Sequence, residues 1–282
     1  MPRFSQVDVF SAEPLRGNPV AVVHDADGVS DEQMAAFARW TNLSETTFLL
    51  APTDADADYR LRIFTPGREL PFAGHPTLGS AHAWLAAGGR PARPGTLVQE
   101  CGAGLVTLRT EPSLAFAAPP LLRSGPLSPE VRAGVLAALG LGEDDVLGMQ
   151  WCDNGPGWVG VLLRSADDVL AVRPDLTRFG EHKIGLVGRY DDRRAAEVGA
   201  LVEVRALAPG LGVVEDPVTG SLNAALAQWL VGDGTLPERY VASQGTLLDR
   251  AGRARVEADP DGTIWVGGDT TTTIVGEVAL DA

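Results

Sequence analysis

The chain has 282 residues, 45% of them apolar and 21% charged, which is typical of a globular protein with one large or two ordinary domains. Its net charge of −14 argues against binding to nucleic acid or anionic membranes, because phosphate-binding surfaces need clustered Lys and Arg. No apolar run is long enough to cross a bilayer and no signal peptide is recognisable, so a cytoplasmic location is expected.

The first half is predicted to consist mainly of strands. Residues 4–10 and 20–23 are short apolar strands that flank a turn-rich segment, which predicts a hairpin with a long loop. Ser30 and Gln33 form a capping box that opens a helix ending near Trp40. Later apolar segments predict further strands at 48–50, 59–64, 96–101, 105–109 and 114–117.

The second half follows a turn-rich stretch from Pro119 to Pro129, which predicts a domain boundary. A helix is expected over 129–139. Strands are expected at 158–163, 184–188 and 202–207, and as a meander over 243–280. The predicted domains are residues 1–118, joined by a C-terminal strand of about 272–282, and residues 119–271.

Two segments 146 positions apart share a pattern. Residues 69–75 read ELPFAGH and residues 215–221 read EDPVTGS, and each follows a strand that ends in Arg-x-x-x-Pro. An offset near half the chain length indicates an internal duplication, and a ligand site is expected between the two related domains.

Each repeated segment leads into a helix, 76–87 or 222–231, that is small or apolar on nearly every face. Such a helix should be buried all round. Strand runs with one such helix per half favour an α+β fold in which a curved sheet wraps a central helix, twice. His75, before Pro76, and Ser221 are expected to cap these helices.

The free N–H groups and partial positive charge of a helix N-terminus bind carboxylates. Gly74 and Gly220 would let a ligand approach the backbone there. Glu45 stands between a helix end and an apolar strand, where desolvation would raise its pKa and suit acid–base work.

Several motifs together carry a resemblance to a known family. The chain resembles the phenazine biosynthesis PhzF-like isomerases of the diaminopimelate epimerase-like fold, from about residue 5 to residue 278. The matching segments are residues 8–10, 17–19, 44–46, 62–66, 72–77, 215–221 and 243–245.

This resemblance implies a cofactor-independent isomerase with two pseudo-symmetric domains, each a curved sheet or barrel around a central helix. It implies that Glu45 is the catalytic acid–base. The implied substrate-binding residues are Gly74, His75, Asp216, Gly220 and Ser221. The implied partners are a small carboxylic acid substrate and a second copy of the chain, in a homodimer.

Racemases of the same fold use two cysteines, one in each glycine turn, but Cys101 and Cys152 lie outside both turns. A two-thiol racemase is therefore disfavoured. The cysteines and the four histidines lack the spacing of a metal site, and no dinucleotide fingerprint or Schiff-base lysine motif is present. Neither a metal nor an organic cofactor is expected.

The leading hypothesis is a proton shift, and thus double-bond isomerisation, on a small unsaturated or cyclic amino or hydroxy acid, in antibiotic or other secondary-metabolite biosynthesis. One alternative is an amino-acid epimerase or racemase of the same fold that uses Glu45 with a second base. Another is a catalytically silent binding protein for small acids, although Glu45, Asp216 and Ser221 are all retained.

Overall fold

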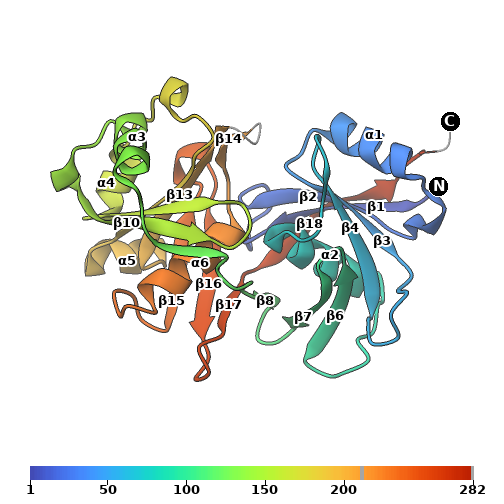
Figure 1. The fold of residues 1–282 in the computed structure, drawn as a ribbon. Helices are drawn as coiled ribbons and strands as arrows, with labels where there is room; N and C mark the ends of the chain where they lie inside the picture. The colour runs from blue at the N-terminus through green and yellow to red at the C-terminus, as the bar shows by residue number, and fades with distance from the viewer. Residues whose placement is uncertain (210–212, 281–282) are drawn as a thin grey trace. The chain divides into compact units, whose positions relative to one another are not determined.

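The computed structural model describes residues 1–209 and 213–280, and the chain forms two compact units (Figure 1). Unit 1 consists of Met1–Ala117 and the C-terminal segment from Gly267, and unit 2 is Ala118–Val266. Residues 281 and 282, the end of the expected C-terminal strand, lie outside the described residues.

The strands of unit 1 form one connected sheet, with two helices packed on it. The strands are β1 (Arg3–Val9), β2 (Asn18–Val23), β3 (Thr46–Leu50), β4 (Tyr59–Phe64), β5 (Glu69–Leu70), β6 (Thr96–Cys101), β7 (Gly104–Arg109), β8 (Ala115–Ala117) and β18 (Thr270–Glu277). The helices are α1 (Asp31–Thr41) and α2 (Gly74–Ala86).

Unit 2 is built in the same way, with additional helices. Its strands are β9 (Arg123–Pro126), β10 (Val146–Asp153), β11 (Trp158–Leu163), β12 (Lys183–Arg189), β13 (Val202–Ala208), β14 (Val213–Asp216), β15 (Arg239–Gln244), β16 (Gly252–Ala258) and β17 (Ile264–Gly267). Its helices are α3 (Pro129–Leu139), α4 (Ala166–Ala171), α5 (Asp192–Val198) and α6 (Gly220–Leu230).

The two units repeat one pattern of strand pairing. In unit 1, β18 pairs antiparallel with β1 and β1 with β2, β2 runs parallel to β3, β3 pairs antiparallel with β4, and β4 runs parallel to β6. Unit 2 repeats this pattern through β9, β10, β11, β12, β13 and β15. Each parallel pair is joined by a crossover that contains a helix, as parallel pairing requires: α1 and α2 in unit 1, and α4 and α6 in unit 2. The predicted duplication and α+β class are therefore confirmed.

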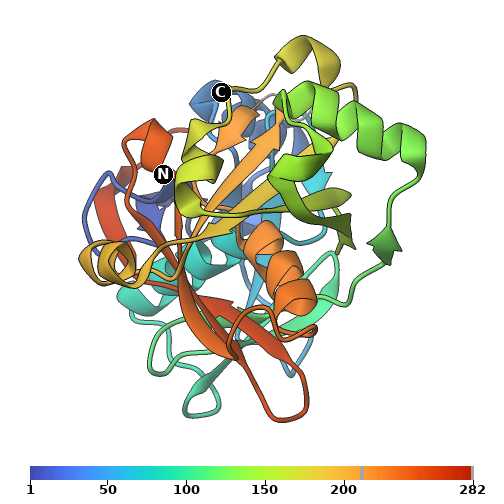
Figure 2. The same ribbon diagram turned by 90° about the vertical axis from the view of Figure 1, so that its left-hand side faces the viewer.

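A helix lies inside the curve of each sheet. α2 packs on β1, β2, β3, β4, β8 and β18, and α6 packs on β10, β11, β12 and β16. Figure 2 shows α6 (orange) among the strands of its own unit. Most residues of both helices are buried, as their apolar composition predicts.

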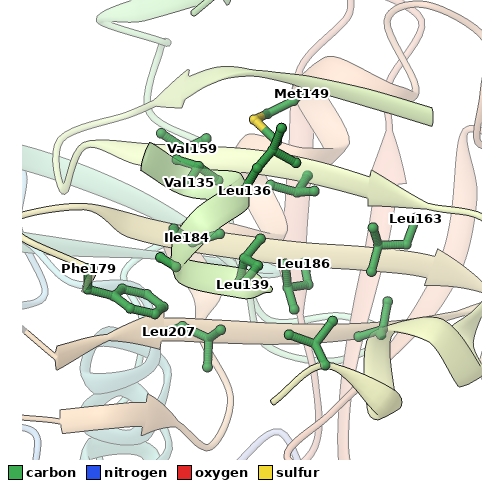
Figure 3. Close-up of a cluster of buried hydrophobic side chains, with 14 residues drawn as sticks. Val135, Leu136, Leu139, Met149, Val159, Leu163, Phe179, Ile184, Leu186 and Leu207 are labelled. Atoms are coloured by element: carbon green, nitrogen blue, oxygen red, sulfur yellow. The ribbon is translucent and has the colours of Figure 1, made fainter. Parts of the chain in front are cut away.

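Other helices cover the outer faces of the sheets. In unit 1, Phe37 of α1 packs with Phe48 of β3 and Phe64 of β4. In unit 2, α3 presents Leu136 and Leu139 to β11 and β12 (Figure 3). Strand alternation explains this layering, because odd-numbered residues of β11 face α3 while Gly160 faces α6.

Several local predictions are confirmed and others are extended. The hairpin of β1 and β2 and the Ser30 capping box of α1 are both present. The strands β5, β9, β10 and β14 and the helices α4 and α5 were not predicted, because short segments with mixed polarity carry little periodicity. No helix in the described part of the chain is long and apolar enough to cross a membrane.

Candidate functional site

Glu45 and His75 are brought together in unit 1. Glu45 immediately precedes β3, and His75 is the second residue of α2. Glu45 Oε2 lies 3.5 Å from His75 Nε2, and both side chains are largely buried, with 16% and 6% exposed. The carboxyl group, which is able to carry a proton, thus lies beside the N-terminal turn of a buried helix, whose partial positive charge favours anions.

This contact is between a carboxyl group and a neutral ring, although its distance is that of an ion pair. Burial lowers the pKa of His75 to about 3, and a hydrogen bond to the Pro19 backbone only partly opposes this. The Asn18 side-chain amide approaches the other ring nitrogen, Nδ1, at 3.5 Å. His75 is therefore an uncharged hydrogen-bonding group at neutral pH.

The N-termini of α2 and α6 differ from those of the other helices. The Ser30, Ser128, Ser165 and Asp191 side chains cap α1, α3, α4 and α5. Ala73 and Thr219 precede α2 and α6, and neither forms a side-chain capping bond. Their first-turn N–H groups are therefore not used by a cap, which suits binding of an anion.

The prediction that His75 and Ser221 cap these helices is wrong. Both helices begin two residues earlier than expected, at Gly74 and Gly220, so that His75 and Ser221 occupy the second helical position. The glycines are already helical, and the capping positions fall to the residues before them. As a result, the His75 and Ser221 side chains do not cap the helices and instead contact Asn18 of β2 and Trp158 of β11.

In unit 2, Gln244 of β15 holds the loop that precedes α6. Its Nε2 donates to the Asp216 carbonyl and to Thr219 Oγ1, both at 3.0 Å. Its Oε1 accepts from Thr219 N at 3.0 Å and from Asn223 Nδ2 at 2.9 Å. Thr219 Oγ1 donates in turn to Asp216 Oδ2 at 2.6 Å. A single buried amide thus fixes the turn that carries Asp216.

Ser221 is held by two side chains that follow β10. Trp158 Nε1 donates to Ser221 Oγ at 3.1 Å, and Asn154 Nδ2 donates to the Ser221 carbonyl at 2.9 Å. Trp158 is 2% exposed and Asn154 8%. Asp153 Oδ1 accepts from two backbone N–H groups of the same loop, which orders it.

Unit 1 holds α2 in a related way. Gln99 of β6 donates from Nε2 to Thr77 Oγ1 at 3.1 Å and accepts from the Tyr59 hydroxyl at 3.0 Å. Thr77 is the fourth residue of α2, as Asn223 is the fourth of α6. In both units a buried glutamine from the corresponding strand therefore anchors the central helix.

The parallel strand pairs allow the two units to be aligned around Glu45. Ala21, the fourth residue of β2, lies opposite Thr46. Val161, the fourth residue of β11, lies opposite Leu186. Thr46 and Leu186 are therefore corresponding positions.

The residue before Thr46 is Glu45, and the residue before Leu186 is Gly185. A side chain has no room at Gly185, because an added Cβ would stand 2.1 Å from Leu222 Cδ1. Leu222 is fully buried in the first turn of α6. In unit 2, the position that corresponds to Glu45 is thus a glycine, and the Leu222 side chain packs against it.

The arginine and glutamate of each repeat form an ion pair. Arg62 contacts Glu69 at 2.7 Å, and Arg205 contacts Glu215 at 2.9 Å, with Arg205 and Glu215 only 4% and 9% exposed. Arg205 also donates to two backbone carbonyls at the end of α4. These pairs brace the short strands β5 and β14 that lead into the motif loops.

Neither cysteine lies in a motif loop. Cys101 is in β6 and Cys152 is in β10. Burial raises the pKa of the Cys152 thiol to about 12, so it remains protonated at neutral pH. Among the described residues, no group of three or more His, Cys, Asp or Glu side chains could hold a metal ion.

Several of these contacts were not predicted from the sequence. Asn18 and Gln244 belong to the matched motifs, but the residues alone gave them no role. Trp158 was seen only as the start of a strand, and Asn154 and Gln99 carried no signal, because their partners are distant in the sequence.

Comparison with known proteins places the chain in a family. The profile of the phenazine biosynthesis-like proteins (PhzC-PhzF) matches residues 7–279. The chain is 37% identical to antisense-enhancing sequence 1 of Schizosaccharomyces pombe, covering 97% of each protein. It is 36% identical to a trans-2,3-dihydro-3-hydroxyanthranilate isomerase of Pseudomonas aeruginosa, covering 93% of this chain and 92% of that protein.

The fold is also similar to a solved structure of a PhzF-family protein from Enterococcus faecalis. The two align with a TM-score of 0.80 over 99% of each chain, at 24% identity. Relatives of at least 33% identity that are named isomerases, including the Pseudomonas aeruginosa protein, support an enzyme of the isomerase class. The chain belongs to the phenazine biosynthesis-like protein family, which confirms the resemblance in the motifs.

Proposed function

We propose that the protein is a cofactor-independent isomerase that shifts a proton, and with it a double bond, on a small unsaturated or cyclic amino or hydroxy acid. The proposed setting is the biosynthesis of antibiotics or other secondary metabolites. The main support is the placement of Glu45 beside His75 and the uncapped N-terminus of α2.

In this mechanism the Glu45 carboxylate removes a proton from a carbon that the substrate's own conjugation acidifies. Negative charge then develops on the substrate, and the N-terminus of α2 stabilises it through its N–H groups. The same carboxyl group returns the proton to another carbon of the conjugated system. His75 stays uncharged, so it can form a hydrogen bond with Glu45 without neutralising the charge of the carboxylate.

Gly185 and Leu222 favour a proton shift over an epimerase with two equivalent bases. An epimerase that inverts a carbon needs a second proton carrier on the opposite face. The position that corresponds to Glu45 in unit 2 carries no side chain, and Leu222 fills the adjacent space. A single carboxyl group suits a reaction in which removal and delivery occur on one face.

Substrate binding by unit 2 is part of the proposal. Asp216, Gly220 and Ser221 lie at the start of α6, whose first turn can accept a carboxylate, as α2 can. We also propose a homodimer, which sedimentation equilibrium would test. A monomer at micromolar concentration would contradict that part.

The reaction is tested with trans-2,3-dihydro-3-hydroxyanthranilate, the compound in the relative's name, and a panel of cyclic and unsaturated amino and hydroxy acids. The reaction is run in deuterium oxide and the label is located by NMR. A migrated double bond, with deuterium at one carbon and partial return of the original proton, is expected from a single carboxyl group. Full deuteration at an inverted α-carbon would instead establish the epimerase.

Two further outcomes test the remaining alternatives. If panel acids bind but are neither converted nor exchange hydrogen with the solvent, the protein is a catalytically silent binding protein. Activity lost with a chelator and restored by added metal would overturn the cofactor-independent mechanism.

A further inference from the structure

We propose that Trp158 is a positioning residue that directs the Ser221 hydroxyl hydrogen toward a carboxylate of the ligand. This proposal rests on the proposed function only in treating Ser221 as part of the binding site. Trp158 is the first residue of β11, and its buried indole reaches the first turn of α6.

The direction of the hydrogen bond follows from the chemistry of the two groups. An indole N–H can only donate, whereas a hydroxyl has one hydrogen and two acceptor lone pairs. Ser221 Oγ must therefore accept from Trp158 Nε1 at their separation of 3.1 Å. Within residues 1–209 and 213–280, no protein atom accepts the Ser221 hydroxyl hydrogen. That hydrogen is available to a ligand.

The position of Ser221 determines which ligand group suits this donor. The residue lies in the first turn of α6, where the N–H groups and the helix dipole favour negative charge. Asn154 holds the Ser221 carbonyl at 2.9 Å, so the backbone is fixed as well as the hydroxyl. A hydroxyl hydrogen and backbone N–H groups at one helix end form a donor set for a carboxylate.

Unit 1 provides an independent parallel. Asn18 is the first residue of β2, as Trp158 is of β11, and Asn18 contacts the second residue of α2, His75. In both units the first residue of the corresponding strand thus contacts the second residue of the central helix. Trp158 occupies a position that the duplicated architecture uses twice.

The test uses Trp158→Phe, which keeps an aromatic ring but removes the N–H. Calorimetry measures the Kd of 3-hydroxyanthranilate, a stable aromatic carboxylate, and of its uncharged amide. We expect the variant to bind the carboxylate about five- to tenfold more weakly, as one misdirected hydrogen bond predicts. Affinity for the amide should change less, so that the carboxylate-to-amide preference falls.

A double-mutant cycle separates positioning from packing. In a Ser221→Ala background, Trp158→Phe should leave the Kd of the carboxylate unchanged, because the hydroxyl that it directs is absent. Trp265→Phe is the matched control: it removes an indole N–H bond to Asp259 of 2.9 Å in the same unit and should not alter the Kd. Melting temperatures of all variants check that each is folded.

The proposal is overturned if Trp158→Phe weakens binding equally in both backgrounds, if it weakens carboxylate and amide alike, or if the wild-type protein does not bind the carboxylate. These readouts need no turnover. A protein that binds as expected but fails to isomerise any panel acid would refute the proposed reaction and leave the role of Trp158 intact.

Discussion

Alternation along β3 decides which way Glu45 points. Thr46 Oγ1 contacts Thr41 of α1, whereas Thr47 Oγ1 contacts Ser80 of α2 at 2.8 Å. Glu45 is two residues before Thr47 and so shares its face, toward α2. Its position relative to the strand, rather than its residue type alone, places a carboxyl group beside His75.

Replacing Glu45 by Gln should abolish chemistry while retaining binding. The amide keeps the size and hydrogen bonding of the carboxyl group but cannot take a proton from carbon. Turnover is expected to fall by about 10³-fold or more, with the Kd of bound acids within about threefold of wild type. Stopped-flow or NMR assays of turnover check this, and activity within about tenfold of wild type would exclude Glu45 as the acid–base.

His75 should make the protein less stable in mild acid. Its pKa is about 3 in the fold and near 6.5 in the unfolded chain, so between these values only the unfolded chain takes up the proton. Stability from this residue is therefore full above pH 6.5 and lost as pH falls, by about 1.4 kcal/mol per pH unit. The difference in unfolding free energy between wild type and His75→Gln should shrink from pH 7 to pH 4.5. Urea titrations at both pH values measure it, and parallel pH dependences would contradict the burial of a neutral ring.

At the scale of single residues, the motifs predicted where the site residues lie better than they predicted the hydrogen bonds of those residues. The matched segments located Glu45 and His75, and the structure places them 3.5 Å apart. The predicted capping roles of His75 and Ser221 were wrong because the glycine before each of them is already the first residue of the helix. The sequence does not distinguish such a glycine from the last residue of a turn. Trp158 could not be anticipated, because its link to Ser221 joins positions 63 residues apart.

The helices α2 and α6 depend on glutamine clamps from neighbouring strands. Gln244 makes four hydrogen bonds to the loop and first turns of α6, and Gln99 makes two around α2. Each amide is buried, so its loss leaves several polar groups without a partner. Both clamps hold the end of the helix that is proposed to bind the substrate.

Gln244→Ala should lower the unfolding free energy by about 2–4 kcal/mol, more than Gln99→Ala, because more buried groups lose their partner. Urea unfolding of both variants measures the difference. In the folded protein, Gln244→Ala should also weaken carboxylate binding, whereas Gln244→Glu should restore part of it by keeping the acceptor for Thr219 and Asn223. Equal destabilisation by the two alanine variants would show that the number of clamp bonds does not determine stability.

At the scale of elements, apolar helices were easier to predict than short polar ones. The apolar pattern predicted α2 and α6 as buried helices, because few surroundings suit a helix that is apolar on every face. The strand pairing could not be obtained in the same way. Whether β2 runs parallel to β3 depends on the path of α1, which no local pattern records.

At the scale of the whole molecule, the two units differ in how the chain supplies them. Unit 2 is one continuous segment, whereas unit 1 takes β18 from the end of the chain. β18 pairs with β1 along most of its length, from Arg3 opposite Glu277 to Val9 opposite Thr270. It also brings Thr270 and Thr272 to the two ring nitrogens of His82 on α2, at 2.8 and 2.9 Å.

Fragments should therefore behave differently. Residues 118–266 are expected to unfold cooperatively on their own, because their sheet and core are complete within one segment. Residues 1–117 should not, because β1 would lose its pairing with β18 and keep only β2, and the His82 ring would lose both threonines. Adding a peptide of residues 267–280 should restore a cooperative melt in circular dichroism, at a temperature that rises with peptide concentration. A scrambled peptide of the same composition should have no effect, since pairing with β1 depends on register. A cooperative melt of residues 1–117 without any peptide would show that β18 is dispensable for unit 1.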